Sequence, residues 1–88
     1  MKAKIIQINK NDNVAVALQP LLRGSSFQLT EQASPVALLN DIPFTHKVAI
    51  RTINSGENII KYGSPIGSAI TSIQAGEHVH VHNIRSNY

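Results

Sequence analysis

The 88-residue sequence contains no cysteine and no tryptophan, and its only aromatic residues are two Phe and two Tyr. Without cysteine the chain has neither a disulfide framework nor thiolate metal ligands. Ile, Val, Leu and Ala must therefore build the core. A core so poor in large side chains, in so short a chain, suggests stabilisation by a partner, either a second copy or a larger chain. The short length and the aliphatic composition of the core predict one small globular domain spanning residues 1–88.

Charge and long apolar runs are also scarce. Charged residues make up 15% of the chain and the net charge is +3, with no run of Lys or Arg. Nucleic-acid-binding domains usually carry a clustered basic stripe interleaved with aromatic residues, so the sequence indicates no nucleic-acid partner. No segment approaches the roughly 18 apolar residues of a membrane span. Residues 1–13 lack the apolar run of a signal peptide. We therefore expect a cytoplasmic protein without membrane contact.

Short apolar runs between turn residues fill the first half of the chain. Residues 3–8 are rich in Ile and predict a strand, and the Asn/Asp cluster at 9–13 predicts a turn. Residues 14–18 are apolar throughout and fit either a strand or a helix. Residues 25–39 predict a hairpin that turns at 31–34. Because no stretch sustains helical spacing between caps, the sequence indicates an all-β fold.

The second half of the chain repeats itself. Residues 53–62 (INSGENIIKY) and 73–82 (IQAGEHVHVH) share the pattern Ile-x-x-Gly-Glu-x-β-branched, and residues 42–51 (IPFTHKVAIR) form a fainter copy. Each copy predicts a turn that leads into a strand. Gly56 and Gly76 would adopt positive φ in these turns, and Ile59 and Val79 would pack inward. Gly63, Pro65 and Gly67 predict sharp bends between the last two copies.

Three of the four histidines alternate with valines in the last copy. On a strand, His78, His80 and His82 would share one face, while Val79 and Val81 would point to the core. Neighbouring histidines of such a face are about 6.6 Å apart at the backbone, and their imidazoles can converge on one metal ion. The same pattern is also typical of a solvated strand face, so this geometry alone leaves both interpretations open.

Other polar residues are weaker candidates. Lys47, Arg51, Lys61 and Arg85 are suited to binding a carboxylate, although each, taken singly, is more typical of a solvated surface charge. Glu57 and Glu77 occupy turn positions of the repeats and predict turn hydrogen bonds. No serine lies in a His/Asp pattern, and no Gly-rich phosphate loop occurs.

Four motifs occur in one order along the chain: DNVAVAL (12–18), HKVAI (46–50), GENIIKYGSPIG (56–67) and GEHVHVHN (76–83). Together they resemble the SAF-type N-terminal domain of the altronate dehydratase and galactarate dehydratase family. The tail HNIRSNY is most similar to the altronate branch. The same domain resembles the small subunit of sulfolactate sulfo-lyase. The similarity spans nearly the whole chain and is weakest over residues 21–39.

This resemblance implies a β-clip fold and a role in sugar-acid catabolism in the cytosol. Members of the family remove water or sulfite from a 2-hydroxycarboxylate with the help of a divalent metal such as Fe²⁺ or Mn²⁺. The partner would be a large catalytic subunit or C-terminal domain. The chain would then be a natural small subunit or a domain of a longer enzyme, inactive alone.

The site hypothesis assigns roles to six residues. His80 and His82 are the expected metal ligands, and both are expected to be catalytic together with His46. Lys61, Lys47 and Arg51 are the candidates for binding the substrate carboxylate. We expect His78 to be a surface residue. Two further functions stay open: a sulfolactate sulfo-lyase small subunit, and a non-catalytic binding or assembly module.

Overall fold

Nine short strands and no helix make up the part of the chain that the computed structural model describes, residues 3–30 and 32–86. The strands are β1 (Ile5–Ile6), β2 (Val14–Ala17), β3 (Ser26–Phe27), β4 (Val36–Ala37), β5 (Lys47–Ala49), β6 (Asn58–Lys61), β7 (Ser64–Ala69), β8 (His78–Val79) and β9 (Ile84–Ser86). The predicted all-β fold is confirmed. None of the described segments is a helix that could cross a membrane.

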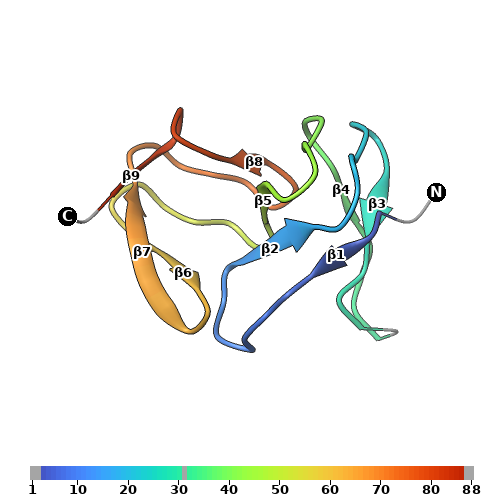
Figure 1. The fold of residues 1–88 in the computed structure, drawn as a ribbon, viewed down its shortest axis with the longest axis horizontal. Coiled ribbons are helices and arrows are strands. Elements are labelled where there is room, and N and C mark those ends of the chain that lie inside the picture. Colours follow the sequence, from blue (N-terminus) through green and yellow to red (C-terminus); the bar gives the residue numbers. More distant parts are fainter. Residues whose placement is uncertain (1–2, 31, 87–88) are drawn as a thin grey trace.

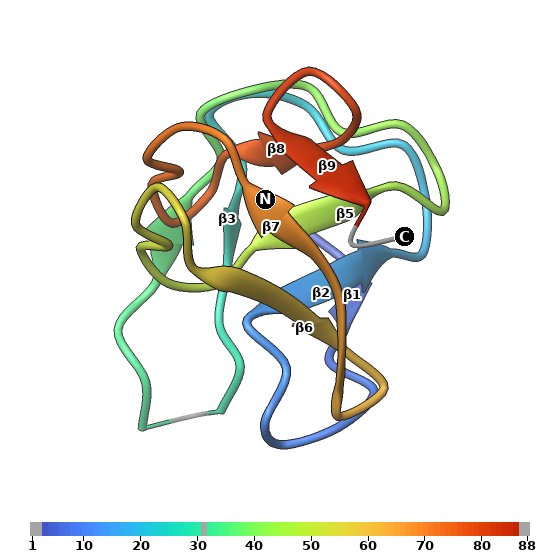
Figure 2. The same cartoon turned by 90° about the vertical axis from the view of Figure 1, so that its left-hand side faces the viewer.

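The strands form three antiparallel sheets along the long axis of a molecule that measures 37 × 23 × 20 Å. The four-stranded sheet β1-β2-β5-β8 lies in the middle, between the β3–β4 hairpin at one end and the β6-β7-β9 sheet at the other (Figure 1). Viewed from that second end, β6, β7 and β9 lie in front of β2 and β5 (Figure 2).

The apolar run that fitted either a strand or a helix is β2, the strand between β1 and β5. Its alternating side chains enter two separate cores: Val14 packs into one and Ala15 into the other. The first core consists of Val14, Ala49, Ile53, Ile59, Ala69, Ile73 and Val79. The second consists of Ala15, Ala17, Leu21, Phe27, Leu38, Ile42 and Val48. A run that is buried on both faces carries no alternation, which explains why its pattern was ambiguous.

The hairpin predicted over residues 25–39 is confirmed by the antiparallel pairing of β3 with β4. Only two residues on each side are paired, and Glu31 of the predicted turn lies outside the described residues. Phe27 is buried, whereas Leu29 is 41% exposed because β3 ends at Phe27. The paired part is therefore shorter than the alternation suggested.

The internal repeat has four copies rather than three, and each runs from a strand end through a turn into the next strand. The copies span residues 17–27, 38–48, 49–59 and 69–79. In each, a turn hydrogen bond closes around a residue with positive φ, as in a type II turn. The four positive-φ residues are Gly24, Thr45, Gly56 and Gly76. Positive φ at Gly56 and Gly76 was predicted and is confirmed.

The copies pair two by two, which explains why there are two cores. In one pair, Gly56 N–H donates to Ala69 O (2.8 Å) and Ala69 N–H donates to Glu57 O (2.9 Å). The turn of Gly76 forms the equivalent two hydrogen bonds with Ala49. An isolated bridge between Ile53 and Ile73 completes the pair. The third and fourth copies thus enclose the first core, and the first two copies enclose the second core in the same way.

Of the bends predicted at Gly63, Pro65 and Gly67, the first is confirmed, since Gly63 has φ 74° in the turn between β6 and β7. The other two are wrong, because residues 64–69 form β7, the longest of the described strands. Among the described residues Pro65 is paired with β6 alone, next to an irregularity in the register of β6 and β7, a position at which proline is tolerated. Gly67 is required for a different reason: a Cβ atom there would lie 2.4 Å from Arg85 O on β9. This glycine permits close strand approach and not a bend.

A buried carboxylate ties the β1–β2 connection to the β6–β7 turn. Asp12 is 3% exposed, and its side chain accepts hydrogen bonds from the backbone N–H groups of Asn9 (3.0 Å), Tyr62 (3.1 Å) and Gly63 (2.8 Å). The neighbouring Asn13 side chain bonds to Asn58 O and Ile60 N–H. The sequence interpretation of these two residues as a simple turn missed this long-range role.

Candidate functional site

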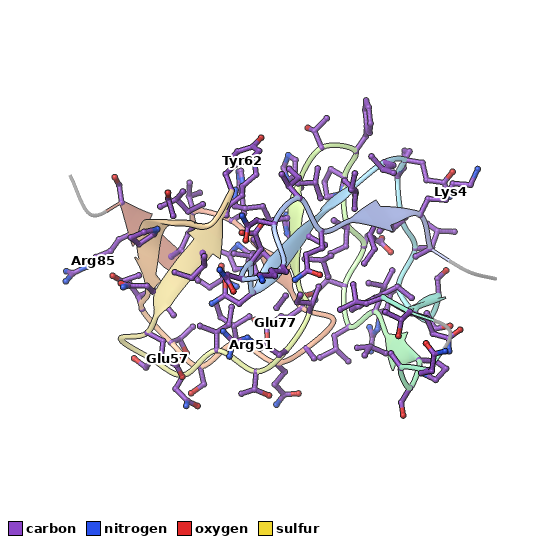
Figure 3. The ribbon with its side chains drawn as sticks, turned by 90° about the horizontal axis from the view of Figure 1, so that it is seen from below. Lys4, Arg51, Glu57, Tyr62, Glu77 and Arg85 are labelled. Carbon is purple, nitrogen blue, oxygen red and sulfur yellow. The ribbon has the colours of Figure 1, made fainter. Side chains whose placement is uncertain are left out.

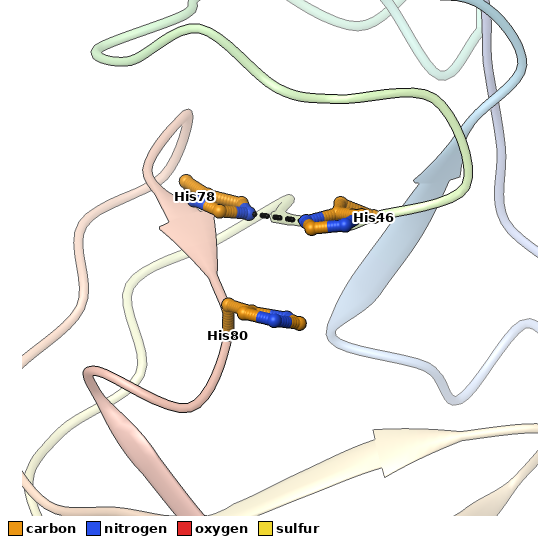
Figure 4. A group of neighbouring side chains, drawn as sticks. All are labelled: His46, His78 and His80. Carbon is orange, nitrogen blue, oxygen red and sulfur yellow. Dashed lines mark hydrogen bonds between the residues drawn. The ribbon is translucent and has the colours of Figure 1, made fainter.

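Histidine side chains from two segments far apart in the sequence meet at one edge of the central sheet. His46 ends the turn before β5, His78 lies on β8, and His80 follows β8 directly. β5 and β8 are paired with Val48 opposite His78, which brings the two segments together. The Nδ1 atom of His46 lies 2.9 Å from Nε2 of His78, and the His46 and His80 rings are stacked with centroids 4.4 Å apart (Figure 4).

These three residues, called the histidine trio below, form a compact set of metal-ligand atoms. One ring nitrogen from each lies within 4.8 Å of the other two, and all three side chains are partly buried. Two nitrogens bound to one ion are about 3 Å apart, which the His46–His78 pair already matches. A donor set made only of imidazoles suits Fe²⁺ or Zn²⁺ better than Mn²⁺, which prefers oxygen ligands. The three histidines therefore fit Fe²⁺ or Zn²⁺.

The chain turns sharply after β8, and this turn decides where each histidine lies. Buried Asn83 holds it: the side-chain oxygen accepts the N–H of His80 (3.0 Å), and the side-chain amide donates to His78 O (2.8 Å). The prediction that Val81 faces the core is wrong. Val81 is 77% exposed, because the strand ends at Val79 and residues 80–83 form the turn.

The predicted histidines therefore have different positions. His80 and His46 belong to the trio, whereas His82 is exposed and its ring lies 5.4 Å from that of His78. His78, expected on the surface, is partly buried and bonded to His46. Its backbone N–H is held by Asn40 Oδ1 at 2.9 Å. Sequence reasoning missed Asn40 and Asn83, because an asparagine in a turn gives no sign that it is reaching another segment.

The lysines predicted to bind substrate come from β5 and β6. Lys47 is partly buried, and its burial, followed by the charge of Lys61, lowers its pKa. Lys61 is also partly buried, with its ammonium group 4.9 Å from the centre of the Tyr62 ring. Arg51 is exposed and projects, like Glu57, from the side of the molecule opposite Tyr62 (Figure 3).

Burial and neighbouring charged groups favour the neutral form of two imidazoles, those of His78 and His80. Burial lowers the pKa of His78, as do His46, His82, His80 and Lys47 in decreasing order. The pKa of His80 is lowered by its partial burial and then by His46, Lys47 and His82. A neutral imidazole is the form that binds a metal ion. The lowered pKa values of His78 and His80 therefore favour the form that can coordinate a metal ion.

These lowered pKa values predict a pH-dependent stability of the metal-free chain. The unfolded chain takes up protons on its histidines near pH 6.5, whereas folded His78 and His80 do so only at lower pH. Protonation of His78 and His80 therefore costs no stability above pH 6.5, and the free energy of unfolding decreases as the pH falls below that value. Urea unfolding in the presence of EDTA should show a lower midpoint at pH 5.5 than at pH 7.5. A midpoint that rises on acidification would contradict the lowered pKa values.

The same measurement on a His78→Gln variant provides the control. Glutamine keeps a polar side chain but does not titrate, so the decline in midpoint below pH 6.5 should be shallower than in the wild-type chain. An unchanged decline would show that His78 does not contribute to it.

The sequence of the chain is similar to those of known proteins. A family model described as the altronate/galactarate dehydratase SAF domain matches residues 3–87. The chain is 48% identical over 82 residues to altronate dehydratase of Escherichia coli (strain K12) and 40% identical over 82 residues to altronate dehydratase of Bacillus subtilis (strain 168). Each alignment covers 93% of the chain but only 16% of the relative.

A second kind of relative is a short chain. The (2R)-sulfolactate sulfo-lyase subunit alpha of Paracoccus pantotrophus is 39% identical over 62 residues, which cover 70% of this chain and 82% of the relative. The domain therefore occurs both within long dehydratases and in relatives that are named as subunits.

Proposed function

The chain belongs to the altronate/galactarate dehydratase SAF-domain family, and on that basis we propose that it is the N-terminal domain or small subunit of an altronate-type sugar-acid dehydratase. The proposal rests on the identity of 48% with a dehydratase of which the chain covers 16%. The remaining catalytic machinery would come from a larger catalytic region or subunit. Cytoplasmic sugar-acid catabolism is part of this proposal.

The single observation that carries the chemistry is the histidine trio. We propose that His46, His78 and His80 hold one divalent ion, with Fe²⁺ favoured over Mn²⁺ by the all-imidazole donor set. When bound, such an ion would supply Lewis acidity that stabilises negative charge on a substrate oxygen. The trio replaces the pair His80 and His82 expected from the sequence, because His82 lies outside the compact group of ligand atoms.

The remaining predicted residues have roles around that site. His82 is exposed beside His78, and we assign it to proton transfer between substrate and solvent, a role that an imidazole side chain can fill. Burial and then repulsion by Lys61 lower the pKa of Lys47, and a bound carboxylate would relieve the repulsion between the two lysines. Arg51 projects from the opposite side to Tyr62, which weakens its assignment to the same substrate.

Reconstitution tests the proposed function. Co-expression of the chain with the catalytic region of an altronate dehydratase, followed by metal loading, should give loss of water from altronate, and omission of the chain should abolish it. A His46→Ala variant should reduce turnover at least about 100-fold, since an outer-shell residue alone accounts for roughly 10- to 100-fold effects. Full turnover by the catalytic region alone would contradict the proposal and would favour an assembly module.

A second candidate function is favoured by one observation, the 39% identity that covers 82% of a sulfo-lyase subunit alpha. In that case the reconstituted complex would release sulfite from sulfolactate. A sulfite assay run in parallel with the altronate assay distinguishes the two, since both substrates are tested on one preparation.

A further inference from the structure

The turn that carries His46 departs from the other three turns of the internal repeat at three positions. The turns span residues 22–25, 43–46, 54–57 and 74–77, and each is closed by a hydrogen bond from its fourth N–H to its first C=O. The third residue has φ between 72° and 91° in all four, and it is glycine in three of them. The second copy has Thr45 there, with φ 72°.

A β-branched residue in this conformation is unusual. Left-handed backbone brings Cβ close to the neighbouring backbone in L-residues, so single positions of this kind favour glycine, asparagine or aspartate. The hydroxyl of Thr45 has no hydrogen-bond partner among the described residues, so no local bond offsets the strain. Strained backbone that persists without local compensation is found preferentially at functional sites.

The first and fourth residues of the turn in the second copy both differ from those in the third and fourth copies. In the third and fourth copies a glutamate occupies the fourth position, and its carboxylate accepts the backbone N–H of the first residue: Glu57 from Asn54 (3.0 Å) and Glu77 from Gln74 (3.2 Å). In the second copy the first residue is Pro43, which has no N–H to be satisfied. His46 at the fourth position is therefore free to reach His78.

We propose that Thr45 is a positioning residue that holds the His46 imidazole in the histidine trio by restricting the backbone of the turn. Two hydrogen bonds, from Thr45 N–H to Ala17 O (3.0 Å) and from His46 N–H to Pro43 O (3.0 Å), keep the turn in its left-handed form. Within that form a residue with Cβ has a narrower range of φ and ψ than glycine. Because His46 is the next residue, the narrower backbone range of Thr45 also restricts the position of the His46 side chain. The strain lies in the left-handed backbone of Thr45. This inference rests on the proposed metal site.

The test is Thr45→Gly in the 88-residue chain, with Gly56→Thr as the matched control. A Cβ at Gly56 would meet nothing within 4 Å, so the control adds only backbone strain in a copy without a histidine. Thr45→Gly should raise the Tm by about 4–8 °C, the shift expected when one strained residue is relieved in a domain of this size. Gly56→Thr should lower the Tm by a similar amount.

Metal affinity and ring mobility separate positioning from stability. Thr45→Gly should bind Co²⁺ about 10-fold more weakly than the wild-type chain, in the range of other residues that orient a ligand, while Gly56→Thr should bind it as the wild type does. In the metal-free chain, ¹³C relaxation should show a more mobile His46 ring in Thr45→Gly alone. A more stable protein that binds metal less well is not expected of a purely structural residue.

Three results would overturn or redirect the inference. Unchanged Co²⁺ affinity and ring mobility in Thr45→Gly would refute it, as would equal weakening of Co²⁺ binding in Gly56→Thr. If the wild-type chain itself takes up no Co²⁺, the proposed metal site fails, and the relaxation of the His46 ring alone then decides whether Thr45 positions it.

Discussion

Replacing His78 with alanine is expected to lower the affinity of the chain for Fe²⁺ or Co²⁺ by at least about 100-fold. His78 contributes one of three imidazole nitrogens that lie within 4.8 Å of one another, and its Nε2 lies 2.9 Å from His46. Loss of a direct ligand should cost at least as much as the roughly 10- to 100-fold loss that follows removal of an outer-shell residue. Isothermal titration under anaerobic conditions at pH 7.5 measures this directly.

His82→Ala is the matched control, since it removes an imidazole from the same turn but from outside the compact trio. Its metal affinity should stay within a few-fold of the wild-type value. Thermal unfolding of both variants establishes that they are folded, and His78→Asn replaces His78→Ala if the latter is not. A loss confined to His82→Ala would return the site to the His80–His82 pair, and equal losses in the two variants would contradict a ligand set limited to the histidine trio.

Replacing Asp12 with alanine is expected to lower the free energy of unfolding by about 3–5 kcal/mol, a large loss for a single polar substitution. The carboxylate is 3% exposed and accepts three backbone N–H bonds that join two distant turns. Alanine would leave those donors without their partner, at about 1–3 kcal/mol each when buried. Native domains are stable by only about 5–15 kcal/mol, so the variant should unfold at a much lower urea concentration.

Asp41→Ala is the control for this effect. Asp41 is exposed and accepts a single bond, from the Arg23 N–H at 2.8 Å, so its loss should cost about 0.5–1 kcal/mol. Urea unfolding followed by circular dichroism compares the two. If Asp12→Ala is no less stable than Asp41→Ala, the clamp between the two turns does not stabilise the fold.

The sequence predicted the fold where each local pattern determines a local structure. Glycines at 56 and 76 predicted left-handed turns, and inward β-branched residues such as Ile59 and Val79 predicted the strands that follow, as the structure confirms. The first copy of the repeat, residues 17–27, was missed because LLRGSSF has Leu21 and Phe27 in place of the isoleucine and the β-branched residue. In the fold both are buried as their counterparts are.

What could not be predicted depends on long-range contacts. The alternation of histidine and valine was extrapolated through Val81, but buried Asn83 ends the strand after Val79 and turns the chain. That turn determines which three histidines meet. The pairing of β5 with β8, which brings His46 to His78, is a contact between residues 32 positions apart that no local pattern encodes.

The most direct test of the metal site is the NMR spectrum of the Co²⁺-loaded chain. Co²⁺ shifts the imidazole resonances of its ligands far outside the diamagnetic range, so the spectrum identifies the coordinating residues one by one through histidine variants. A site formed by the histidine trio predicts three shifted imidazoles, each lost in turn in the His46, His78 and His80 variants, and all retained in His82→Ala. Shifted signals that disappear with His82, or no shifted imidazole at all, would contradict it.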